Sequence, residues 1–211
     1  MCDDPNMDNL LMNGRVGMET QARLKDGTGI VIRPMTEDDV DKSWAFFQKL
    51  PEEDRAYLRV DVTKRDVVEE RIRDMRSGAV KRLVALAGDE IVADRALELA
   101  GAGWKEHVAE LRLIVARPYQ HKGVGMLMAR DLYSLASAEK AEEVVVKMMA
   151  PQVAARRIFH KLGFKEETVL PSYVKDIAGR KQDLIVMRSE LGALWRELEE
   201  QMAMSDWQRT R

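Results

Sequence analysis

The chain of 211 residues has little cysteine, few aromatic residues and almost no net charge. Its single cysteine, Cys2, lies near the N-terminus, so no internal disulfide can form and nothing argues for secretion. No apolar run approaches the length of a membrane span, and the N-terminus lacks the basic and apolar regions of a secretory signal. A net charge of −2 argues against general nucleic-acid binding, which needs a clearly basic face. We therefore expect a cytoplasmic protein with neither a nucleic-acid partner nor a membrane partner.

Histidine is scarce as well. The three histidines, His107, His121 and His160, are scattered without metal-ligand spacing, so we expect no metal site. Hydrophobic residues make up 45% and charged residues 33% of the chain, which is typical of a globular protein. The length is sufficient for one domain with a sizeable core and extensions.

Three segments are predicted along the chain. Residues 1–20 are rich in Asp, Asn, Gly and Met without a sustained period, which indicates a mobile N-terminal leader. Residues 21–190 are expected to form one folded domain. Residues 191–211 predict a C-terminal amphipathic helix that packs on its own chain, and monomer and homodimer both remain open. The apolar face of this helix comprises Leu191, Leu194, Trp195, Leu198 and Met202.

The order of secondary structure indicates a mixed sheet with helices packed on it. Strands are predicted at residues 29–33, 82–87, 91–99, 107–116, 143–149, 165–174 and 183–188. Helices are predicted at residues 36–49, 52–59, 64–78, 123–138 and 154–162. Strands first follow one another directly and then alternate with helices, so the fold class is α/β or α+β.

One hexapeptide follows the fourth predicted strand and opens a helix. It reads Gln120-His121-Lys122-Gly123-Val124-Gly125. A strand that breaks into a glycine-bearing turn before a helix leaves backbone N–H groups unpaired, and these donors favour an anion such as a phosphate. The hexapeptide lacks the third glycine of a dinucleotide fingerprint and the Gly-Lys-Ser/Thr of a P-loop. An ordinary strand-to-helix turn, in which the glycines only relieve strain, is the alternative.

This arrangement resembles the GNAT superfamily of acyl-CoA-dependent N-acetyltransferases, whose motif Gln/Arg-x-x-Gly-x-Gly/Ala stands at the same place. A second motif of that family, Asn-x-x-Ala-x-x-x-Tyr-x-x-x-Gly-Phe, is similar to residues 152–164, which end in Lys-Leu-Gly-Phe. The resemblance spans about residues 29–188. It implies that residues 21–190 are an acyltransferase domain with a mostly antiparallel sheet, splayed between its fourth and fifth strands, and helices on both faces.

A narrower resemblance concerns the acceptor. Residues 50–59 and the pair Ala109-Glu110 are similar to the bacterial protein-lysine acetyltransferase branch. This implies transfer of an acetyl group from acetyl-CoA to a primary amine, such as that of a protein lysine. A small-molecule amine is an alternative acceptor, and a non-catalytic acyl-CoA-binding sensor or regulatory module is an alternative function. An acidic, open cleft between residues 50–60 and 176–182 would suit a lysine, and a closed, aromatic one a metabolite.

The resemblance also implies the cosubstrate site. The backbone of Leu113, Ile114 and Val115 would bind the pantetheine arm, and the backbone N–H groups from His121 to Met126 would hold the pyrophosphate. Gly123 and Gly125 would let the phosphates approach, because a Cβ would hold them away. Lys122 either adds charge beside the phosphates or is a solvated turn lysine. The predicted cosubstrate residues are Leu113, Ile114, Val115, Gln120, His121, Lys122, Gly123, Val124, Gly125, Met126 and Gln152.

The resemblance implies that Glu110 is the general base, because it lies ten residues before Gln120, where the protein-acetylating branch has its base. A lysine amine with a pKa of about 10.4 is mostly protonated at neutral pH, so direct attack on a thioester needs a base. The alternative is a strand-edge carboxylate that faces solvent or pairs with Arg112. The general acid is not evident, because Phe159 stands where the family often has tyrosine. The proton would come from water or from Tyr119, Tyr133 or Tyr173, or the thiolate, with a pKa of about 8.5, would leave without help.

Overall fold

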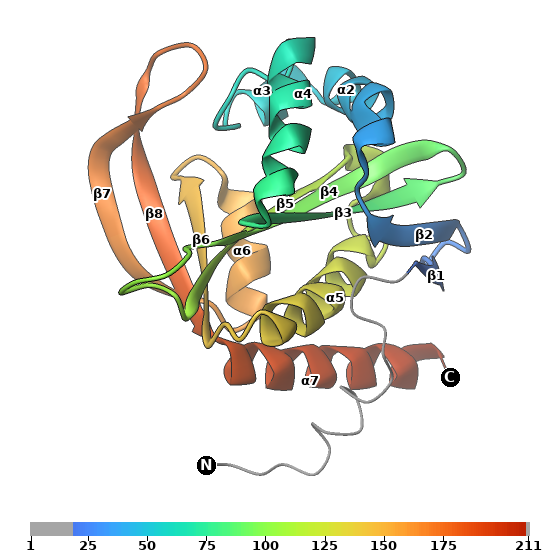
Figure 1. Cartoon of the computed structure of the whole chain (residues 1–211). Helices are drawn as coiled ribbons and strands as arrows, with labels where there is room; N and C mark the ends of the chain where they lie inside the picture. Colours follow the sequence, from blue (N-terminus) through green and yellow to red (C-terminus); the bar gives the residue numbers. More distant parts are fainter. Residues whose placement is uncertain (1–18, 210–211) are drawn as a thin grey trace.

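The computed structural model describes residues 19–209, with side chains described up to Glu200 (Figure 1). Cys2, most of the predicted leader and the side chain of Met202 lie outside the described residues. The strands are β1 (Thr20–Arg23), β2 (Gly29–Pro34), β3 (Val80–Ala87), β4 (Glu90–Leu99), β5 (Val108–Val115), β6 (Glu143–Met149), β7 (Lys165–Lys175) and β8 (Lys181–Glu190). They form one sheet with the order β1-β2-β3-β4-β5-β6-β8-β7.

The helices connect and cover this sheet. The α-helices are α2 (Val40–Lys49), α3 (Glu52–Arg55), α4 (Arg65–Arg73), α5 (Val124–Ala138), α6 (Val153–Lys161) and α7 (Leu191–Arg209). Short 3-10 helices are η1 (Glu37–Asp39), η2 (Asp74–Ser77) and η3 (Arg117–Tyr119). In the described part of the chain, no helix is both long enough and apolar enough to cross a membrane.

The sheet opens between β5 and β6. Every other strand pair is antiparallel, whereas β5 and β6 are parallel and pair only over Val108–Glu110 and Glu143–Val145. Beyond these residues the two strands diverge, while β6 stays paired with β8 along its whole length. The predicted mixed, mostly antiparallel sheet with a splay at this place is therefore confirmed.

Helices cover both faces of the sheet, as predicted (Figure 1). Val84 of β3 packs in one cluster with Phe47 of α2 and Val68 of α4. Its neighbour Ala85 points to the other face and packs with Met128 of α5. Adjacent residues of a strand face opposite sides, so the apolar run of β3 contributes to a core on each face.

The C-terminal helix packs on its own chain. Leu194 and Leu198 of α7 are fully buried in the cluster that also contains α5 and α6 residues. The Trp195 ring lies 4.5 Å from the ring of Tyr133, between centroids. This confirms the predicted packing within the chain.

Two elements differ from the sequence prediction. Strand β1 was not foreseen, although Asp26-Gly27 is a hairpin signal; Gly27 has a φ of 85° in the turn between β1 and β2. The helix predicted at 52–59 is only the four-residue α3. Beyond it, the carbonyl of Ala56 accepts a hydrogen bond at 3.2 Å from the N–H of Ile177. A contact with the β7–β8 connection thus replaces the continued helix.

Candidate active site

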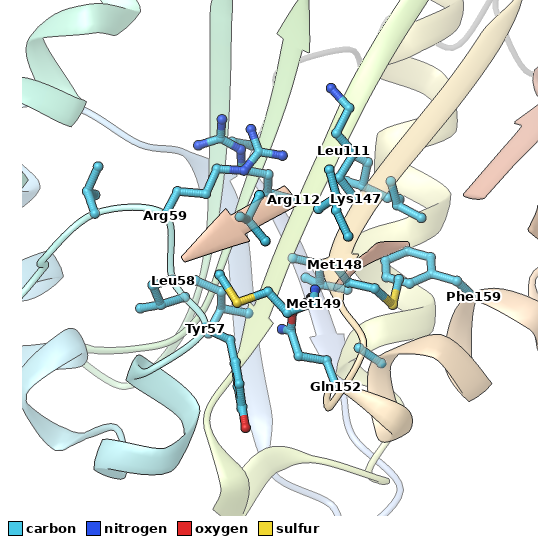
Figure 2. Close-up of a pocket in the computed structure, with 18 of the residues that line it drawn as sticks. Tyr57, Leu58, Arg59, Leu111, Arg112, Lys147, Met148, Met149, Gln152 and Phe159 are labelled. Carbon is cyan, nitrogen blue, oxygen red and sulfur yellow. Dashed lines mark hydrogen bonds between the residues drawn. The ribbon is translucent and has the colours of Figure 1, made fainter. Parts of the chain in front are cut away.

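A cleft of about 470 Å³ occupies the space where β5 and β6 diverge (Figure 2). Residues 57–60, after α3, form one wall, and the diverging strands and β7 form the others. The bond between Ala56 and Ile177 joins the connection after α3 to the β7–β8 connection at its rim. The divergence leaves the facing edges of β5 and β6 without strand partners, so backbone donors and acceptors are available to a ligand.

The residues predicted to bind the pantetheine arm lie on this open edge. Leu113 and Ile114 line the cleft directly. The carbonyl of Val115 accepts a hydrogen bond at 2.9 Å from the side-chain nitrogen of Gln120. Gln120 therefore fixes the end of β5 against the loop that precedes α5.

The glycine-bearing loop forms the N-terminus of α5. Gly123 is the N-cap residue with a φ of 98°, and His121 also has a positive φ, 62°. The first backbone bond of the helix runs from the N–H of Leu127 to the carbonyl of Gly123, at 3.1 Å. The N–H groups of the three residues before Leu127 have no carbonyl earlier in the helix. A Cβ on Gly125 would meet open space, so the approach to these donors is unobstructed, which fits an anionic group.

The side chains of this segment anchor it. Val124 is fully buried, and Met126 packs against the main core. Lys122 forms an ion pair with Asp26 at 2.7 Å, and its ammonium lies 5.4 Å from the ring centroid of Tyr119. The hydrogen bond from Lys122 lowers the pKa of Asp26 to about 2. The β1–β2 hairpin thus holds the loop and partly neutralises the cation beside it.

Glu110 belongs to the last parallel pair, where the strands begin to diverge. Its side chain is 16% exposed. Arg59 donates to Oε1, and Lys147 of β6 donates to Oε2 at 2.6 Å. Arg112, which was considered as a partner of Glu110, instead pairs with Glu98 at 2.6 Å. Both oxygens of the predicted base are therefore engaged by cations.

Gln152 and Phe159 both line the cleft. The Gln152 side-chain oxygen accepts a hydrogen bond at 2.8 Å from the N–H of Met149, which secures the end of β6. Phe159 is 8% exposed and packs edge-on against Phe164, with 5.2 Å between ring centroids. Phe159 is therefore both a core residue and a wall of the cleft.

The tyrosines considered as proton donors are dispersed. Tyr173 lines the cleft, whereas Tyr133 of α5 does not line it and packs against Trp195 of α7. Tyr119 lies beneath Lys122. Tyr57, which the sequence analysis did not single out for this role, also lines the cleft (Figure 2).

The sequence did not predict that five cationic residues gather in the cleft. These residues are Arg59, Arg71, Arg82, Arg112 and Lys147. They come from five separate segments of the chain, so no local sequence pattern indicates that they lie together. Across the described part of the chain, no group of three or more His, Cys, Asp or Glu side chains could hold a metal ion.

The chain is similar to known proteins over this same region. The family model described as an acetyltransferase (GNAT) domain matches residues 30–165. The solved GNAT domain of S. lividans PAT is 17% identical with a TM-score of 0.67, and the match covers 82% of this chain and 96% of that one. No curated protein matches the chain.

Two further solved structures were determined with a CoA ligand. Mycobacterium smegmatis RimJ in complex with CoA-disulfide is 16% identical with a TM-score of 0.69, covering 86% of this chain and 93% of that one. The putative acetyltransferase yncA from Salmonella typhimurium, with its cofactor acetyl-CoA, is 18% identical with a TM-score of 0.62, covering 77% and 94%. At these identities the likenesses show a shared fold.

Proposed function

Because the chain belongs to the GNAT acetyltransferase family, we propose that it transfers an acetyl group from acetyl-CoA to a primary amine in the cleft between β5 and β6. Family membership identifies an acetyl-CoA-dependent enzyme and so disfavours the sensor considered from sequence. The observation that carries the proposal is the continuity of two features: the open edge of β5 leads directly to the glycine-lined N-terminus of α5.

Each feature supports one part of cosubstrate binding. The N–H groups of Val124, Gly125 and Met126, with the positive end of the α5 dipole, are suited to a pyrophosphate. The unpaired edge at Leu113 and Ile114 is suited to the amides of a pantetheine arm. When bound, acetyl-CoA supplies the thioester carbonyl that the amine attacks.

We propose Glu110 as the group that takes the proton of the acceptor amine. Its ion pair with Lys147 supports this role, because a primary ammonium already reaches Oε2 at 2.6 Å. An acceptor amine would exchange with Lys147 at that oxygen, while Arg59 keeps Oε1 oriented. A base at this point makes a neutral amine available and keeps the proton from returning.

A thiolate with an ordinary thiol pKa of about 8.5 can leave unassisted, but a proton donor would make its departure easier. Phe159 carries no proton, and Tyr57 and Tyr173 both line the cleft. We propose that one of these two hydroxyl groups protonates the sulfur. The Tyr57→Phe and Tyr173→Phe variants identify it, because loss of a general acid lowers kcat by about 10²- to 10⁴-fold.

The proposed function is tested by acetyl-CoA binding together with release of free thiol over a panel of amines. We expect the native chain to release thiol only when an amine is present. The Gly123→Glu variant should lose acetyl-CoA binding, and Glu110→Gln should bind acetyl-CoA but turn it over slowly. Tight binding of acetyl-CoA without thiol release from any amine would refute the enzymatic proposal.

A further inference from the structure

The cleft is cationic, which is neither of the two environments weighed from the sequence. The carboxylates that pair with its five cations, among the described residues, are Asp94, Glu98 and Glu110. The cluster therefore has more positive than negative side chains. A cleft of this kind repels an isolated ammonium and attracts an anion.

Arg59, Arg112 and Lys147 each have a close carboxylate partner, whereas Arg71, Arg82 and one nitrogen of Arg112 are poorly satisfied by the protein itself. Arg82 is 6% exposed and reaches Asp94 only at 3.4 Å, and its Nε has no hydrogen-bond partner within the described chain. Arg71 shares the same carboxylate, also at 3.4 Å. The Nε of Arg112 is likewise buried without a partner in the described residues. Buried donors without partners carry a free-energy cost that a bound acceptor would remove.

The cations also oppose one another. Burial lowers the pKa of Arg59, and the nearby Arg112 lowers it further. Burial lowers the pKa of Arg71 to about 10, with Asp94 opposing the shift and Arg82 and Arg112 adding to it. Figure 2 shows the Arg59 and Arg112 side chains extending toward each other from the connection after α3 and from β5. Glu98 already pairs with both guanidinium groups, 3.7 Å from Arg59 and 2.5 Å from Arg112, and an anion bound beside it would relieve the repulsion that remains.

The phosphates of acetyl-CoA do not account for this cluster. In the register of β4 and β5, Glu98 is opposite Glu110 and Asp94 is opposite Ile114, so these residues share one face of the sheet. Ile114 packs with the α2 and α4 cluster, whereas α5 covers the opposite face. Arg112 precedes the end of β5 at Val115 by three residues, about 10 Å of strand, and the loop is farther still.

From this separation we propose that the acceptor is a primary amine that carries its own carboxylate or phosphate, which Arg59 and Arg112 bind while the amine reaches Glu110. The proposal rests on the proposed acetyl transfer and specifies its acceptor. Arg59 connects the two parts of the site, because it contacts both Glu110 and Glu98. The anionic group and the amine must then be close together in the acceptor. Glu98, which pairs with Arg59 and Arg112, is directly opposite Glu110 in the sheet.

The test compares amines that differ in the anion. The pairs are O-phosphoethanolamine with ethanolamine, γ-aminobutyrate with butylamine, and the capped dipeptides Glu-Lys with Gln-Lys. Thiol release from acetyl-CoA gives kcat/KM for each, and we expect the anionic member of at least one pair to exceed its partner 10-fold or more. The dipeptide pair separates a protein lysine from a small acceptor as the source of the anion.

Variants of Arg59 and Arg112 test whether the preference for anionic amines depends on the cationic residues of the cleft. Arg59→Gln and Arg112→Gln should each reduce the anionic-to-neutral ratio at least fivefold, a readout that a general loss of activity would not move. Arg76→Gln is the matched control, because Arg76 is 65% exposed and pairs with Glu37, and neither residue lines the cleft. This variant should keep the ratio of the native chain.

The outcomes separate this proposal from the function on which it rests. Neutral amines that react as fast as their anionic partners overturn the acceptor class and leave the transferase intact. If acetyl-CoA binds but no amine reacts, the function fails, and thermal unfolding with O-phosphoethanolamine and with γ-aminobutyrate decides the binding claim. A midpoint raised by either compound in the native chain and in Arg76→Gln, but not in Arg59→Gln, supports the claim; no rise with either compound in the native chain overturns it.

Discussion

The Nζ of Lys147 on β6 lies 2.6 Å from the Oε2 of Glu110 on β5, across the point where the two strands separate. The parallel pairing brings Glu110 opposite Val145, two residues before Lys147. A carboxylate and a primary ammonium therefore meet at the entrance to the open edge. The chain thus contains, in its own side chains, a contact of the kind proposed between Glu110 and the acceptor.

The first prediction concerns Glu110→Gln. We expect kcat/KM to fall about 10²- to 10⁴-fold at pH 7, because the amide cannot accept a proton. The deficit should shrink as the pH rises toward the acceptor's own pKa of about 10.4, where the amine loses its proton without help. Glu98→Gln removes a carboxylate from the same cluster and should give a loss that does not vary with pH. Near-native activity of Glu110→Gln at pH 7 would exclude Glu110 as the base.

The second prediction concerns Gly125→Ala. Gly125 lies within α5 and its added Cβ would meet open space, so the change should raise stability by up to about 1 kcal/mol. If phosphates approach the backbone there, the methyl group should weaken acetyl-CoA binding 10-fold or more. Gly192→Ala is the control in α7, where the Cβ would make an ordinary contact at 3.9 Å with Arg196. Calorimetric titration and thermal unfolding of both variants separate binding from stability.

The sequence predicted the strands of the sheet other than β1, and most of the helices, because each has a local signal. The β-branched run of β2 ends at Pro34, and the helical spacing of Val68 and Ile72 in α4 is independent of the rest of the chain. Helix α3 stops early for a reason outside its own sequence, since Ala56 bonds to Ile177 more than a hundred residues away. The residues around α3 therefore contain no pattern that indicates this contact.

The site residues could likewise be predicted from the sequence only where they are contiguous along the chain. The loop from Gln120 to Gly125 is contiguous, so its pattern predicted a helix N-terminus that the structure has. The cations are brought together only by the strand register and by the loop after α3. Arg59 and Lys147 are 88 positions apart by their numbers, yet both donate to Glu110. Spacing along the chain could not reveal that the cleft is basic.

The third prediction concerns Gly163→Ala, at the end of α6. Gly163 has a φ of 80°, and its Cβ would lie 2.8 Å from the Cγ of Glu197. The left-handed backbone alone costs about 1–2 kcal/mol. Gly179→Ala is the matched control, because Gly179 has a φ of 79° with nothing near its Cβ. We expect Gly163→Ala to lower the free energy of unfolding by more than Gly179→Ala does.

Adding Glu197→Ala to Gly163→Ala should remove the extra loss in the free energy of unfolding, since the side chain that the new Cβ crowds is then absent. Urea unfolding of the single and double variants measures the coupling between the two positions. Equal losses for Gly163→Ala and Gly179→Ala would show that α7 moves aside at no cost.

The fourth prediction concerns Arg95, whose side chain is buried beneath α5. Arg95 is 1% exposed, and neither Nη1 nor Nη2 has a hydrogen-bond partner within the described residues. Burial lowers its pKa to about 9, and Asp131 opposes the shift. Because the folded pKa is below the unfolded value, the unfolded chain binds this proton more tightly, so the charge destabilises the fold in full below pH 9.

Arg95→Met should therefore raise the free energy of unfolding at pH 7 by about 1–4 kcal/mol, since an apolar side chain of similar length replaces a buried charge. The gain should shrink above pH 9, where the native Arg95 begins to lose its proton in the folded state. Asp131→Asn, added to Arg95→Met, removes a carboxylate whose remaining cationic partner, Arg130, is 3.5 Å away, and should increase the gain at pH 7. Urea unfolding at pH 7 and pH 10 measures both effects. A loss of stability in the double variant would mean that the guanidinium stabilises the fold through contacts beyond Asp131.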